Sequence, residues 1–74
     1  MNEELLKQHT DVLMDRLDGV QEQERAKIKA LLEDAIILIL DYTDRTTEQM
    51  NDQLYYYARQ LVVIAWNQEG NEGD

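Results

Sequence analysis

The sequence contains no cysteine, no proline and no phenylalanine, and only three of its 74 residues are glycine. Without cysteine the chain has neither disulfide bonds nor a thiolate metal centre, which fits a cytoplasmic protein. A domain of this size buries only about 60% of the surface that its unfolded chain exposes, so its own core is small. We therefore expect oligomerisation to supply part of its stability.

Positive charge is also scarce, because seven Lys and Arg residues stand against sixteen Asp and Glu residues, for a net charge of -9. Such a chain repels a phosphate backbone at long range, so we do not expect it to grip nucleic acid. The apolar run AIILIL at 35–40 is six residues long. A membrane span needs about 18 such residues, so we expect no membrane contact.

The residue types that carry catalysis are missing as well. The chain has no serine or cysteine nucleophile and no glycine-rich phosphate loop. Its single histidine, His9, falls on the apolar side of a predicted helix, where a packed imidazole with one hydrogen bond is expected. Asp41, Asp44 and Glu48 lack the glycine and the ligand spacing of a calcium loop. We predict no enzymatic activity, no metal and no cofactor.

In place of these features the chain has strong helical periodicity. Apolar residues recur at helical spacing from 28 to 42, and no proline interrupts them. A buried strand over 35–40 is the weaker alternative. We predict an all-α fold, in which a short first helix packs on a long antiparallel helical hairpin and forms a three-helix-bundle-like domain over residues 1–68. A flexible polar tail is expected over residues 69–74.

Capping signals predict where the helices begin and end. The expected helices span about 3–17, 21 to 42 or 43, and 46–68. Asn2 is the expected N-cap of the first helix, and Gly19 is expected to end it in a left-handed conformation with Val20 folded back on Met14. Capping boxes are expected at Asp18 with Gln21 and at Thr46 with Gln49. Gly70 is expected to stop the third helix.

Apolar residues occupy more than one side of the second and third helices. The expected core faces are Ile28, Leu32, Ala35, Ile39 and Tyr42, flanked by Leu31 and Leu38, and then Met50, Leu54, Ala58, Leu61 and Ala65. Seven further apolar residues are the predicted subunit interface, namely Ile36, Ile37, Leu40, Tyr55, Tyr56, Val63 and Trp66. Scattered apolar residues on a surface are ordinary. Two helices that each carry a second apolar stripe favour contacts between identical subunits instead, because Tyr and Trp are enriched at such contacts.

Two stretches carry a resemblance to a known family. They are LLEDAIILILDYTDR at 31–45 and WNQEGNEGD at 66–74, and the likeness extends over about residues 10–74. Its most specific positions are Tyr42, Arg45, Trp66, Asn67, Gly70, Glu72 and Gly73. In the order of these features the chain resembles the head-tail connector (head completion or adaptor) family of tailed phages and prophages. It departs from that pattern at 48–50, where a proline is common, and it lacks the Ser- and Gly-rich tail.

The resemblance implies a structural protein of the virion, made in the host cytoplasm and located at the head-tail junction. Subunits of this family form a dodecamer-like ring between the portal protein and the tail or stopper protein. DNA then passes through the lumen without specific binding. The resemblance also implies that Asn67, Gly70, Glu72 and Gly73 belong to a segment that docks on partners. The alternative from charge alone is a small acidic regulatory or DNA-mimic module that binds a basic protein.

Overall fold

The computed structural model describes residues 2–72 and forms an all-α fold, as predicted. Within these residues the helices are α1 (Glu3–Arg16), α2 (Arg25–Thr43) and α3 (Asp52–Glu72). Single 3-10 turns precede the last two helices, η1 at Glu22–Glu24 and η2 at Thr47–Gln49. The described part of the chain contains no strand, so the run at 35–40 is helical.

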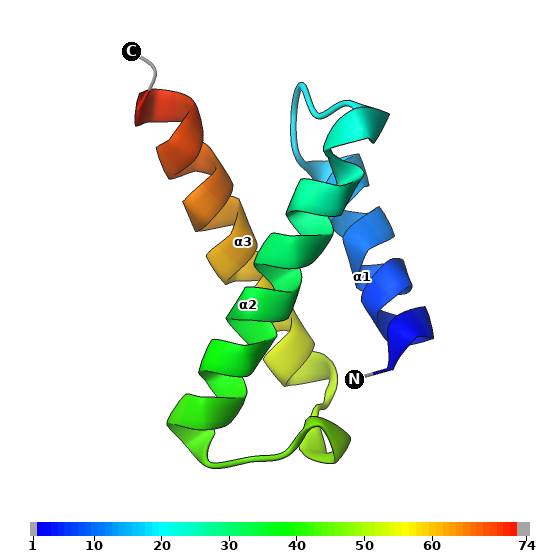
Figure 1. The fold of residues 1–74 in the computed structure, drawn as a ribbon, viewed down its shortest axis with the longest axis vertical. Coiled ribbons are helices and arrows are strands. Elements are labelled where there is room, and N and C mark those ends of the chain that lie inside the picture. The colour runs from blue at the N-terminus through cyan, green and yellow to red at the C-terminus, as the bar shows by residue number, and fades with distance from the viewer. Residues whose placement is uncertain (1, 73–74) are drawn as a thin grey trace.

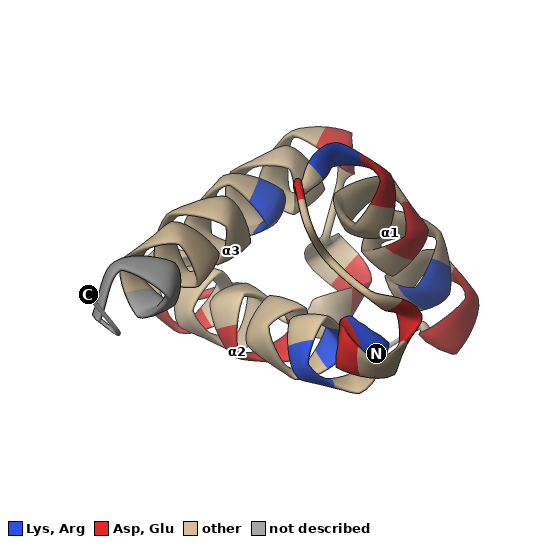
Figure 2. Cartoon of the chain, turned by 90° about the horizontal axis from the view of Figure 1, so that it is seen from above, with Lys and Arg blue, Asp and Glu red and all other residues tan. Residues whose placement is uncertain are grey.

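The longest helices, α2 and α3, run in opposite directions and cross as an open hairpin (Figure 1). α2 packs against both other helices, whereas α1 makes a smaller contact with α3. Seen from above, the three helices lie along the sides of a triangle (Figure 2). The predicted arrangement, a short helix packed on a long hairpin, is therefore confirmed.

The first helix begins as its sequence predicts and ends differently. The Asn2 side chain accepts hydrogen bonds from the backbone N–H groups of Glu4 and Leu5, at 2.9 and 3.2 Å, so Asn2 is the N-cap. Gly19 has a left-handed φ of 74°. It lies in the turn beyond the helix, because Leu17 already takes an extended conformation while its N–H still donates to Leu13. The predicted left-handed conformation of Gly19 is thus confirmed, but the prediction that Gly19 ends the helix is wrong.

Capping boxes close the two 3-10 turns. The predicted box at Asp18 and Gln21 is wrong, because the Gln21 N–H donates to the Glu24 carboxylate at 3.1 Å. A glutamate three residues after Gln21 gives the reciprocal pairing that Asp18 cannot provide. The predicted box at Thr46 and Gln49 is confirmed.

The connection between α2 and α3 has two features that the capping signals did not predict. Asp44 ends α2 in a left-handed conformation, with φ 55°, and the following N–H donates to Leu40 at 2.9 Å. α3 begins only after η2, where the Asn51 side chain accepts from the Leu54 N–H at 2.9 Å. The η2 turn lies beside α1, since Thr47, Glu48 and Met50 share a depression with Asn2 and Leu5.

The last helix is longer than predicted. α3 continues to Glu72, so Gly70 does not stop it and residues 69–72 do not form the predicted tail. Glycine inside a helix costs about 1 kcal/mol relative to alanine, which weakens a helix without breaking it, and no proline follows. Residues 73–74 of the predicted tail lie outside the described residues.

The core lies where all three helices meet. Its buried members are Leu6, Leu13, Leu17, Ile28, Leu32, Ala35, Ile36, Leu40, Tyr55, Ala58 and Val62. Thr10 is buried beside them and its hydroxyl donates to the Leu6 carbonyl at 2.7 Å. Ile36, Leu40 and Tyr55 were predicted at a subunit interface, and that prediction is wrong. α2 packs against both α1 and α3, so its buried stripe is wide and includes Ile36 and Leu40.

Candidate interaction surface

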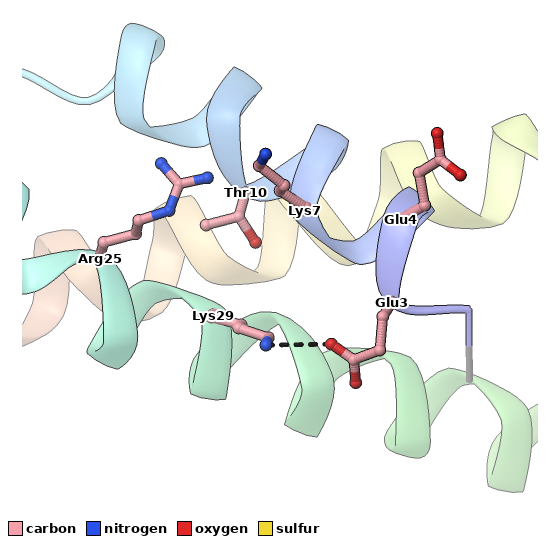
Figure 3. Close-up of a pocket in the computed structure, with 6 residues that line it drawn as sticks. All are labelled: Glu3, Glu4, Lys7, Thr10, Arg25 and Lys29. Carbon is pink, nitrogen blue, oxygen red and sulfur yellow. Dashed lines mark hydrogen bonds and ion pairs between the residues drawn. The ribbon is translucent and has the colours of Figure 1, made fainter.

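A polar depression lies between α1 and the start of α2 and is lined by Glu3, Glu4, Lys7, Thr10, Arg25 and Lys29 (Figure 3). The Lys29 ammonium lies 3.1 Å from the Glu3 carboxylate. Arg25 pairs with Asp11 and, at 4.0 Å, with Glu22. Both Lys29 and Arg25 already pair with carboxylates of the chain. We therefore interpret the depression as a contact between α1 and α2 rather than as an anion site.

A polar cluster joins α1 to α3. The His9 ring stacks on Tyr55, with centroids 4.2 Å apart and planes 9° apart. The Arg59 guanidinium lies 2.6 Å from His9 Nδ1. Guanidinium groups only donate hydrogen bonds, so Nδ1 accepts and neutral His9 carries its proton on Nε2. The packed, hydrogen-bonded imidazole predicted from the sequence is confirmed.

This cluster makes the stability of the fold depend on pH. Burial first and the Arg59 charge second lower the pKa of His9 below its usual 6.5, against the opposing pull of Asp52. The unfolded chain therefore binds the proton more readily than the folded chain does. The stability that neutral His9 contributes is present above pH 6.5 and is lost as the pH falls below that value.

We accordingly expect the melting temperature to fall between pH 7 and pH 5.5, measured by circular dichroism. In the variant His9→Gln the melting temperature should change much less over this range, because ordinary carboxylates titrate lower. A variant that keeps the wild-type slope would show that other groups cause it.

An apolar groove lies between α2 and α3. It has a volume of about 430 Å³ and is lined by Leu38, Ile39, Tyr42, Thr43, Leu54, Tyr57 and Leu61. Leu38 is 64% exposed and Tyr42 is 92% exposed. Ile64, three residues beyond Leu61, continues the apolar edge of α3 and is also exposed. We call this surface the α2–α3 groove.

The residues that the sequence predicts at an interface lie in three environments. Ile37 and Tyr56 are exposed, at 56% and 46%. Val63 and Trp66 are half-buried and pack against the core, and the Lys27 ammonium lies 5.5 Å from the centre of the Trp66 ring. Ile36, Leu40 and Tyr55 are in the core, as described above.

The predicted docking segment lies at the end of α3. Asn67 is an exposed residue of that helix, and Gly70 and Glu72 also belong to it. Gly73 is outside the described residues.

Sequence reasoning missed the α2–α3 groove. Leu38, Tyr42 and Leu61 were assigned to the core, and Tyr57 and Ile64 were assigned to no surface. A signal for the groove was present, because Leu38 and Tyr42 are four residues apart and Tyr57 and Ile64 are seven apart, so each pair shares one side of its helix. Periodicity alone could not show that this side faces out.

Comparison of the chain with protein-family models, with curated proteins and with solved structures gives no match. None of the helices in residues 2–72 combines the length and the apolar character needed to cross a membrane. In the same residues, no three His, Asp or Glu side chains gather as a set of metal ligands. The surfaces of the molecule are therefore the basis for a functional proposal.

Proposed function

We propose that the protein is a structural subunit of a ring-shaped head-tail connector of a tailed phage or prophage. Copies of the chain form a ring between the portal protein and the tail or stopper protein, at the head-tail junction of the virion. The ring extends the DNA channel, and DNA passes without specific binding. The observation that carries the proposal is a pair of exposed apolar residues on two different helices, with unlike charges beside them.

The first of these surfaces is on α2. Ile37 is 56% exposed, and Glu33 lies four residues before it on the same side of the helix. An exposed isoleucine beside a carboxylate gains from burial against an apolar partner that also carries positive charge.

The second surface is on α3 and has the opposite charge. Tyr56 is 46% exposed, and the Arg59 guanidinium lies 6.0 Å from the centre of its ring. Val63, seven residues after Tyr56, extends the same side of the helix. A ring in which every subunit has two different neighbours needs two unlike surfaces that fit each other. The Ile37 and Tyr56 surfaces meet that requirement in both apolar character and charge.

Mixing two variants tests this proposal. Ile37→Lys places a cation where the neighbour brings Arg59, and Tyr56→Asp places a carboxylate where the neighbour brings Glu33. Each variant alone should lose self-association at least tenfold, and light scattering should show a species of 8.7 kDa. An equimolar mixture should form a dimer and stop there, because one intact surface of each kind remains.

The wild-type protein serves as the reference, and electron microscopy with and without its portal protein should show rings. A mixture that stays monomeric would mean that the two surfaces do not meet. A wild-type protein that remains a monomer even with the portal would contradict the connector role itself.

The net charge of -9 supports a second candidate, a small acidic regulatory or DNA-mimic module that sequesters a basic protein. In that case the chain would capture its partner as a monomer or dimer, and the two variants above would leave binding unchanged. The assembly state therefore separates the two functions.

A further inference from the structure

The α2–α3 groove is separate from both surfaces assigned to the ring. Leu38 and Tyr42 form one wall on α2, and Tyr57 and Leu61 form the other on α3. Ile37 and Tyr56 do not line it. Leu54 and Leu61 are seven positions apart, which at 1.5 Å per residue is about 10 Å, or two turns of a docked helix.

The charges beside the groove are unevenly distributed. Asp34 lies four residues before Leu38 and Asp41 lies three residues after it, so both carboxylates border the α2 wall. Neither forms an ion pair with another described residue, and Asp44 adds a third carboxylate just beyond Thr43. The cation nearest to Asp44 in sequence is Arg45, which lies in the turn beyond α2.

The α3 wall has almost no charge. Arg59 is the only charged residue from 53 to 68, and its guanidinium is bound to His9 on the α1 side. The groove is therefore apolar along its floor, acidic along α2 and neutral along α3, and Figure 2 shows the acidic positions along α2 and the nearly uncharged α3.

We propose that the α2–α3 groove binds an amphipathic α-helix of a different protein, with an apolar stripe on the groove floor and Lys or Arg residues along the flank that meets α2. Insertion of an apolar helix face into a groove is a common mode of peptide recognition. Charge complementarity favours a basic flank, since cations there would face Asp34 and Asp41. A second copy docked groove to groove offers no such cation, because Arg59 is the only charged residue of its α3 from 53 to 68 and is bound to His9.

Two synthetic 18-residue helical peptides are suitable probes. Both have leucines at positions i, i+3, i+7 and i+10, and one has lysine along both flanks where the other has glutamate. Calorimetry at low salt should show the lysine peptide binding at least tenfold more tightly than the glutamate peptide. The variant Asp34→Lys should reduce this preference at least threefold, because it reverses one of the bordering charges.

The location of binding is tested with matched variants. Leu38→Gln combined with Leu61→Gln should weaken the lysine peptide at least tenfold, whereas Ile37→Gln, an equally exposed change outside the groove, should alter it less than twofold. All three positions are exposed, so circular dichroism should show an unchanged fold.

Several results would overturn the proposal. They are equal affinity for the two peptides, absence of saturation below 1 mM, or equal weakening by the Ile37 variant. A fourth is conversion of a wild-type oligomer to a monomer by the Leu38 and Leu61 changes, which would assign the groove to a second copy. The inference does not depend on the connector function, because Tyr56→Asp, which adds no cation beside Asp34 and Asp41, should abolish the ring and leave peptide affinity intact.

Discussion

Replacing Ile36 with alanine should lower the free energy of unfolding by about 2–5 kcal/mol, which is the usual cost of truncating a large aliphatic side chain in a core. Ile36 is 0% exposed and belongs to the cluster shared by all three helices. Native domains have a total stability of only about 5–15 kcal/mol, so this loss should remove a large fraction of it. Urea unfolding followed by circular dichroism at micromolar concentration measures the change.

The adjacent residue provides the control. Ile37→Ala removes the same atoms from the same helix one position later, where the side chain is 56% exposed. Its effect on the single chain should stay within about 0.5 kcal/mol. Equal losses in the two variants, or a larger loss at Ile37, would mean that α2 is rotated from the orientation described here.

Replacing Ala58 with leucine should destabilise the fold by about 1–3 kcal/mol, through overpacking rather than through a cavity. Ala58 is fully buried on α3, and Ala35 is buried on α2. Both belong to one cluster, in which small side chains allow helices to pack closely. A larger side chain at 58 has to separate the helices or displace Leu32 or Ile36 from its rotamer.

The melting temperature of Ala58→Leu should therefore fall by about 4–8 °C for each kcal/mol lost. Ala30→Leu is the matched control, because Ala30 is exposed on α2 and leucine is nearly as good a helix former as alanine. If Ala58→Leu melted at or above the wild-type temperature, the packing described at this position would be incorrect.

The number and order of the helices could be predicted because the signals for them are local. Apolar spacing without proline defines three helical segments, and the Asn2 cap and the Thr46 box depend only on residues within one turn. The prediction for Gly70 failed because glycine only weakens a helix, so one glycine without a following proline is a poor stop signal.

Which side of α2 faces inward could not be predicted from its own sequence. The run 35–40 is apolar around the whole circumference of the helix, so periodicity gives the spacing of residues without fixing the rotation. The rotation is decided by packing against both α1 and α3, which leaves Ile36 buried and Leu38 and Tyr42 exposed. The same rotation of α2 leaves Leu38 and Tyr42 exposed in the α2–α3 groove. Periodicity therefore did not predict the groove either.

The left-handed conformation of Asp44 determines which side of the α2–α3 hairpin is left uncovered. This conformation directs the chain away from the axis of α2. The next seven residues cross to the N-terminal end of α1, where three of them form η2 (Figure 1). The linker thus lies on the side of the α2–α3 hairpin that α1 already covers. A connection that crossed the other side of the hairpin would have covered Tyr42 and Tyr57. A protein with this same core would then have no α2–α3 groove open to a partner helix.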